Sequence, residues 1–177
     1  MSAWPYPAPL DDGAARHLPG RALPDITLPS TRGEPVSPAR VPGRLILYAY
    51  TWTGRPGLAN PPDWDAIPGA HGSTPEAEGF RELFPEFVAR GVTLLGLSTQ
   101  DPAHQSEFAI RLALPFALLS DADLAVARAL ALPTFATGGA VYLKRLTLLA
   151  RDGRIEKAFY PVHPPDTHAG EVLAWLG

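Results

Sequence analysis

The chain has 177 residues, of which 46% are hydrophobic and 19% are charged, and its formal net charge is −3. This length is enough for one domain with a substantial core, and the mildly acidic balance without a run of Lys or Arg argues against nucleic acid and anionic membranes as partners. The absence of cysteine from the sequence excludes disulfides, thiolate catalysis and cysteine-ligated metal sites.

Residues 1–20 contain four prolines and two glycines without apolar periodicity, and they predict an irregular arm ahead of one domain at 21–177. Trp4 and Tyr6 of this arm could pack on the domain or on a second subunit, which leaves both a monomer and a homodimer open. The start lacks a basic segment followed by an apolar one, and no apolar run approaches the roughly 20 residues that span a bilayer. We therefore expect a cytoplasmic protein without a membrane span.

The first predicted strands precede a long loop. A short strand pair is predicted at 25–28 and around Val36, separated by the turn residues 31–34. The nearly continuous apolar run at 44–50 is typical of a strand that is covered on both faces. The loop at 51–72 follows this strand.

A helix is predicted from about Thr74 to Arg90. Four apolar residues recur at the spacing of one helix face: Phe80, Leu83, Phe84 and Phe87. Gly91 is a favourable residue for the end of the helix.

The middle of the chain alternates strands and helices. We expect a buried strand at 92–97, a helix at 101–112, a short strand at 115–119 and an alanine-rich helix that ends at 131. Asp101 followed by Pro102 is a good start for the first of these helices, and Asp121 or Asp123 can cap the second.

The last third predicts an antiparallel hairpin and a closing helix. Strands are expected at 140–150 and 154–160, joined by the turn at Asp152-Gly153. An amphipathic helix is expected at 166–176. This order predicts an α/β fold, a thioredoxin-like mixed sheet with helices on both faces and an N-terminal strand-pair extension.

The residues around Ser73 have a purely structural interpretation, which we favour. In a capping box, Ser73 would accept a hydrogen bond from the amide of Glu76, and the Glu76 side chain would reach back to the Ser73 amide. Thr74 as the N-cap with Pro75 in the first helical position is an equally good alternative. Such a cap stabilises a helix by about 1 kcal/mol, and Glu76 and Glu78 would also place negative charge near the positive end of the helix dipole.

The run at 69–81, Gly-Ala-His-Gly-Ser-Thr-Pro-Glu-Ala-Glu-Gly-Phe-Arg, resembles the active-site turn of the Q-type (bacterioferritin-comigratory) peroxiredoxins of the AhpC/TSA superfamily. In that family the turn reads Gly-Cys-Thr-x-x-x-Cys-x-Phe-Arg. The resemblance places Ser73 at the peroxidatic cysteine and Glu78 at the resolving cysteine, five residues later. Gly72 and Thr74 flank Ser73 as candidate binding residues, and Ala70 stands where the family pattern has a threonine.

The resemblance extends over about 20–176 and implies a role for one arginine. Residues 114–121, Leu-Pro-Phe-Ala-Leu-Leu-Ser-Asp, are similar to the family's "LPFPLLSD" stretch. Residues 144–153 are similar to its "R-x-T-F-L-I-D-x-x-G" strand and hairpin. The resemblance implies that Arg145 points at the position of the reactive sulfur and of bound peroxide.

Other chemistry has weaker signals. His71 with Glu76 or Glu78 could ligate a metal, but the spacing matches no metal motif. His163 and His168 are expected in an exposed turn before the last helix. We predict no metal and no cofactor. A Ser73 nucleophile for hydrolysis lacks the Gly-x-Ser-x-Gly elbow.

The expected function is a peroxiredoxin-like protein without thiol peroxidase activity. A serine hydroxyl is far less acidic than a thiol and cannot cycle through a sulfenic acid. The vacated pocket at the helix start with Arg145 would suit a small anion or a peroxide. Two alternatives remain: a one-cysteine, thiol-dependent peroxide reductase in which Ser73 is an engineered or variant replacement, and a structural or interaction module.

Overall fold

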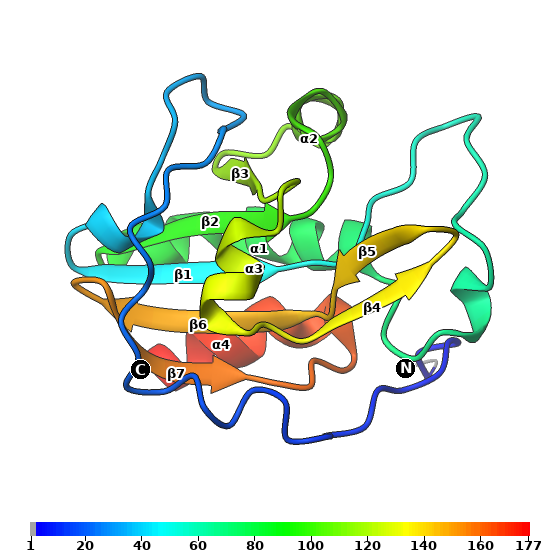
Figure 1. Ribbon diagram of the computed structural model, residues 1–177. Coiled ribbons are helices and arrows are strands. Elements are labelled where there is room, and N and C mark those ends of the chain that lie inside the picture. The colour runs from blue at the N-terminus through cyan, green and yellow to red at the C-terminus, as the bar shows by residue number, and fades with distance from the viewer. Residues whose placement is uncertain (1–2) are drawn as a thin grey trace.

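A five-stranded mixed sheet forms the centre of the protein in a computed structural model that describes residues 3–177 (Figure 1). The strand order is β3-β2-β1-β6-β7; β1, β2 and β3 are parallel, whereas β6 and β7 are antiparallel to their neighbours. The strands are β1 (Arg44–Ala49), β2 (Val92–Ser98), β3 (Ala117–Ser120), β6 (Leu146–Arg151) and β7 (Arg154–Phe159).

Helices cover both faces of this sheet, as predicted. They are α1 (Ser73–Ala89), α2 (Pro102–Arg111), α3 (Ala125–Leu130) and α4 (His168–Leu176), with 3-10 turns at Pro38–Arg40, Trp64–Ala66 and Pro165–Thr167. In Figure 1, α3 lies in front of the sheet, and α1 and α4 lie behind it. Asp101 caps α2 as predicted, because its carboxylate accepts from His104 N at 2.8 Å.

The side chains of β1 alternate between two apolar clusters, because successive residues of a strand point to opposite faces. Leu45 and Leu47 belong to the cluster that α3 covers together with the segment at 15–28. Ile46 and Tyr48 belong to the cluster that α1, α2 and α4 cover. Burial on both faces explains why the strand reads as a continuous apolar run.

The strand predicted at 140–150 is two strands, which is a correction with consequences for the site. β5 (Ala140–Leu143) pairs with β4 (Thr134–Thr137), a strand that we did not predict, and these two form a separate hairpin. Gly138 and Gly139 turn this hairpin with φ values of 58° and 79°, in the left-handed region that glycine tolerates. The chain leaves the hairpin at Lys144 and Arg145 before it joins the main sheet as β6.

The predicted N-terminal strand pair is reduced to a single bridge. Leu28 and Val36 exchange two backbone hydrogen bonds, with N–O distances of 2.8 and 2.9 Å. Pro29 and Pro35 follow and precede these residues and have no N–H to extend the ladder.

The described part of the N-terminal arm has no helix and packs on the rest of the chain (Figure 1). Leu18 is fully buried, and Gly20 N donates to Ile155 O on β7 at 2.7 Å. Closer to the start, Asp12 accepts from Lys144 Nζ at 2.9 Å and from the Tyr160 hydroxyl at 2.8 Å. The arm therefore runs across the molecule to the junction between β5 and β6.

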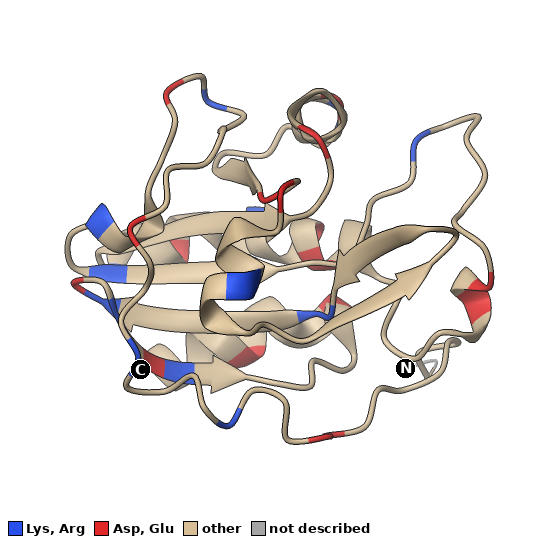
Figure 2. Cartoon of the chain, viewed as in Figure 1, with Lys and Arg blue, Asp and Glu red and all other residues tan. Residues whose placement is uncertain are grey.

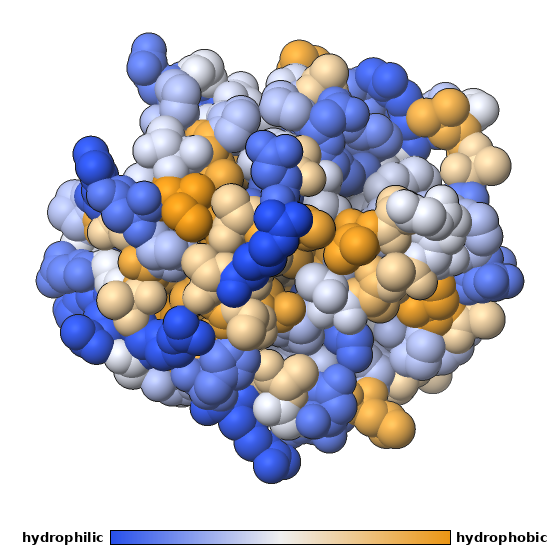
Figure 3. Space-filling view, in the orientation of Figure 1, coloured by the Kyte–Doolittle hydropathy of each residue, from blue (hydrophilic) through white to orange (hydrophobic). Residues whose placement is uncertain are grey.

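Charge and apolar surface are both dispersed. Figure 2 shows residues of both signs spread along the chain. In Figure 3 the apolar side chains of this face occur in small groups among hydrophilic ones. Within residues 3–177, no helix is long and apolar enough to cross a membrane.

Candidate functional site

The candidate site lies at the first turn of α1, and its geometry corrects the predicted helix cap. The helix begins at Ser73, and Gly72 is the N-cap, with a φ of 116°. No side chain caps this end. The predicted capping box is wrong because Glu76 turns inward instead of reaching back, and Thr74 lies inside the helix rather than at the N-cap.

Arg145 is the centre of the site. Its guanidinium is buried, with 4% of the residue exposed, and pairs with the fully buried carboxylate of Glu76. Nη2 of Arg145 lies 3.2 Å from Ser73 Oγ, and it also faces the carbonyl oxygens of Ala70 at 3.4 Å and His71 at 3.3 Å. The interruption between β5 and β6 places this arginine, because Arg145 is the last residue before β6 begins.

Thr51, which no sequence motif singled out, supplies a hydroxyl at the site. Thr51 directly follows Tyr50 at the carboxyl end of β1, where polar residues commonly serve binding sites in parallel sheets. Its Oγ1 donates to Ala70 O at 2.6 Å and lies 3.2 Å from Ser73 Oγ. Ala70 has no hydroxyl of its own and contributes its carbonyl oxygen.

An aromatic pocket of about 240 Å³ lies in front of Ser73. Its lining is Trp4, Tyr6, Trp52, Gly54, Asn60, Trp64, His71, Gly72, Ser73, Thr74 and Pro75. Tyr6 of the arm stacks on the His71 ring, with centroids 3.6 Å apart. The arm therefore contributes one wall of the pocket.

The predicted metal alternatives do not match the observed contacts. His71 Nε2 contacts Asp65 Oδ1 at 2.6 Å, whereas Glu76 is paired with Arg145. His168, expected in an exposed turn, is buried, and its Nε2 lies 2.7 Å from Thr147 Oγ1, because the first turn of α4 packs against the sheet. Within residues 3–177, no three potential His, Asp or Glu ligands form a metal-binding group.

Glu78, which the resemblance places at the resolving cysteine, is half-buried on α1. Among the described residues, the side-chain hydrogen bonds of Ser73 and Arg145 do not include it. Glu78 is therefore separate from the buried polar cluster below Ser73.

Burial controls the electrostatics of that cluster. It raises the pKa of Glu76 despite the opposing effect of Arg145 and, more weakly, of His168. It also raises the pKa of Tyr48 far above its ordinary range, with the nearby Tyr50 and Glu76 adding to this effect. Tyr48 hence stays a neutral phenol.

The sheet order and the helices on both faces define a thioredoxin-like fold, in which Arg145 faces the first turn of α1. The Redoxin family model matches residues 18–173, and the chain belongs to this family.

Within the family, the relatives are Q-type peroxiredoxins. A Coxiella burnetii protein assigned as peroxiredoxin bcp is 32% identical over 162 residues, which cover 89% of this chain and 97% of that protein. The chloroplastic peroxiredoxin Q of Oryza sativa subsp. japonica is 28% identical over 89% of this chain. The alignment spans 65% of the length of the rice protein.

Solved structures of Q-type peroxiredoxins are also similar to this chain. Peroxidoxin BcpB from Mycobacterium tuberculosis superimposes with a TM-score of 0.72 at 27% identity, over 90% of this chain and 97% of that one. A cysteine-to-serine mutant of Xanthomonas campestris peroxiredoxin Q has a TM-score of 0.70 at 26% identity, over 90% and 95% of the two chains. The chain is thus a Q-type peroxiredoxin-like protein that contains no catalytic thiol.

Proposed function

We propose that the protein is a non-catalytic binding protein that holds a small hydroperoxide or a small anion over Ser73. Without cysteine, the chain has no thiolate to attack peroxide and no sulfenic acid to recycle. The remaining site is a hydrogen-bonding pocket with an aromatic rim.

One observation carries this proposal: the Ser73 hydroxyl lines the pocket and is held from behind by a buried polar cluster. Arg145 Nη2 and Thr51 Oγ1 each lie 3.2 Å from this oxygen. The first amides of α1, at Ser73 and Thr74, are among those that have no partner within a helix. A ligand oxygen in the pocket would face the Ser73 hydroxyl and these amides.

The charge of the cluster favours a hydroperoxide over an anion. The guanidinium of Arg145 is already compensated by the buried carboxylate of Glu76. An uncharged hydroperoxide accepts hydrogen bonds there without adding a second negative charge beside that carboxylate. The helix dipole is the remaining attraction for an anion.

The full chain should be titrated with tert-butyl hydroperoxide, acetate and phosphate. Because Trp4, Trp52 and Trp64 line the pocket, binding should change tryptophan fluorescence, and Ser73→Val should weaken this response by removing a polar contact. No saturable response to any of the three probes would show that the proposal is wrong. Peroxide consumption with dithiothreitol should equal the buffer control.

The second candidate is a one-cysteine peroxide reductase in which Ser73 replaces a cysteine. The observation that favours it is that Ser73 opens α1 with its Oγ 3.2 Å from Arg145 Nη2, at the position that the resemblance gives to the peroxidatic cysteine. Ser73→Cys should then create thiol-dependent peroxide consumption, and a cysteine codon at this position of the gene would make this candidate correct. Failure of Ser73→Cys to consume peroxide would count against it.

A further inference from the structure

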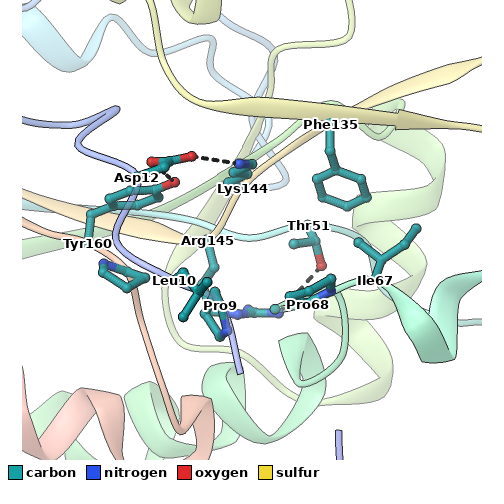
Figure 4. A pocket seen from close by; sticks show the side chains of 12 residues that line it. Pro9, Leu10, Asp12, Thr51, Ile67, Pro68, Phe135, Lys144, Arg145 and Tyr160 are labelled. Carbon is teal, nitrogen blue, oxygen red and sulfur yellow. Dashed lines mark hydrogen bonds and ion pairs between the residues drawn. The ribbon is translucent and has the colours of Figure 1, made fainter. Parts of the chain in front are cut away.

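A second cavity lies beside Arg145, away from Ser73 (Figure 4). Its volume is about 350 Å³, within the range of about 300–1,000 Å³ of small-molecule pockets. The arm contributes Pro9 and Leu10, the long loop contributes Ile67 and Pro68, and β4 contributes Phe135. Ser73 and Thr74 line only the other pocket.

The walls are apolar, and the charged groups at the cavity are compensated. Lys144 is paired with Asp12 at 2.9 Å, and the Tyr160 hydroxyl donates to the same carboxylate at 2.8 Å, as Figure 4 shows. Arg145 is paired with Glu76. A charged ligand would have to displace one of these pairs, so the lining favours an uncharged molecule.

One residue of this lining carries a buried donor that has no acceptor. Arg145 lines the cavity and is 4% exposed, and its Nε has no hydrogen-bond partner among residues 3–177. A buried, unpaired donor costs about 1–3 kcal/mol, a cost that a ligand oxygen can relieve. Thr51, also on the lining, already donates its hydroxyl to Ala70 O.

We propose that this cavity binds a small, uncharged and mainly apolar molecule with one hydrogen-bond acceptor, such as an alcohol, a ketone or an ester. The apolar walls would hold the carbon skeleton, and Arg145 would donate to the oxygen. Arg145 also contacts Ser73 Oγ through Nη2, but the two pockets share no lining residue.

The arm is part of the proposed site. Pro7 O accepts from Gly69 N at 3.1 Å on one side of the cavity, and Asp12 holds the arm on the other. Leu10 lies between these anchors and is 84% exposed. A bound molecule would cover part of the Leu10 side chain and order this stretch of the arm.

Benzyl alcohol, toluene and benzoate are suitable probes of the full chain, followed by two-dimensional amide NMR. Benzyl alcohol should give saturable shifts at Gly69, Lys144 and Arg145. Toluene should bind more weakly because it has no acceptor, and benzoate should bind more weakly because it meets Asp12. Tighter binding of benzoate, no saturable shift, or shifts centred on His71 and Thr74 would overturn the proposal.

A matched pair of variants tests the arm wall. Leu10→Asp should weaken benzyl alcohol binding, because it places a charge at the apolar lining. Ile110→Asp is the control, since Ile110 on α2 is similarly exposed, at 80%, and lies outside the cavity. Equal affinity in the two variants would refute the role of the arm. Peroxide binding over Ser73 should be the same in both, which separates this test from that of the proposed function.

Discussion

The buried pair of Arg145 and Glu76 is the principal feature of the protein at the scale of single residues. Removing a charge from water is costly, and the raised pKa of Glu76 reflects this cost. The guanidinium also contacts Ser73, so the pair connects the main sheet to the start of α1. The contacts of Arg145 with Glu76 and Ser73 thereby support both the fold and the candidate site.

Glu76→Gln should lower the free energy of unfolding by about 3–5 kcal/mol, because it leaves the Arg145 charge buried and unpaired. Urea unfolding followed by circular dichroism measures this change. Glu78→Gln is the control, since Glu78 is only half-buried. The double variant Glu76→Gln with Arg145→Met should recover much of the loss; a double variant as unstable as Glu76→Gln would contradict the explanation.

At the scale of elements, the start of α1 depends on one glycine. Gly72 has a φ of 116°, and a Cβ at this position would collide with the Pro165 ring before α4. The helix can therefore approach the turn at 165–167 only with glycine here.

Gly72→Ala should destabilise the protein by about 1–3 kcal/mol through backbone strain, with a further cost from the collision with Pro165. Thermal unfolding measures the loss. Gly170→Ala on α4 is the control, because its Cβ would meet no atom within 4 Å. Equal stability of the two variants would refute the requirement for glycine at the start of α1.

The arm is held by the Asp12 carboxylate, and this contact predicts that the stability of the protein depends on pH. Hydrogen bonds from Lys144 and Tyr160 lower the pKa of Asp12 from 3.8 to about 2. A carboxyl with a lowered pKa contributes stability above its unfolded value, and this contribution is lost as the pH falls from about 3.8 towards 2.

Asp12→Asn should therefore be less stable than the original chain at pH 5, and the difference should shrink towards pH 2.5. Urea unfolding at both pH values measures it, and Asp11→Asn, whose carboxylate does not contact Lys144, is the control. If the stability difference between Asp12→Asn and the original chain grew as the pH fell, the proposed contribution of the Asp12 carboxylate would be wrong.

At the scale of the whole molecule, the N-terminal segment is part of the core. Leu18 is fully buried in the cluster on the α3 face, together with Leu47 of β1 and Leu148 of β6. The arm and the domain should hence unfold in one cooperative transition.

Leu18→Ala should cost about 2–5 kcal/mol, as expected for a large-to-small change in a core. Leu10→Ala, at an exposed position of the same arm, should change stability by less than about 0.5 kcal/mol. Urea unfolding followed by fluorescence and by circular dichroism should give coincident transitions for both variants. Separate transitions would show that the arm is not part of the domain.

Local patterns were sufficient for most elements. A continuous apolar run predicted β1, helical periodicity predicted α1, and the Asp101-Pro102 start predicted α2, each within one or two residues. The apolar run at 140–150 concealed the break before β6, because each half is consistent with a strand by itself. The inward turn of Glu76 was also hidden, since a first-turn glutamate is equally good as a cap.

The amino-acid sequence by itself determined the order of the helices and of the main-sheet strands, the Redoxin-type turn and the absence of thiol chemistry, because these depend on residue types and short spacings. Only the tertiary structure decided that Thr51, Ser73 and Arg145 meet, that Glu76 neutralises the arginine, and that the arm forms a wall of two pockets. Those contacts join residues from distant parts of the chain, and their geometry follows from how the sheet, the loop and the arm pack together.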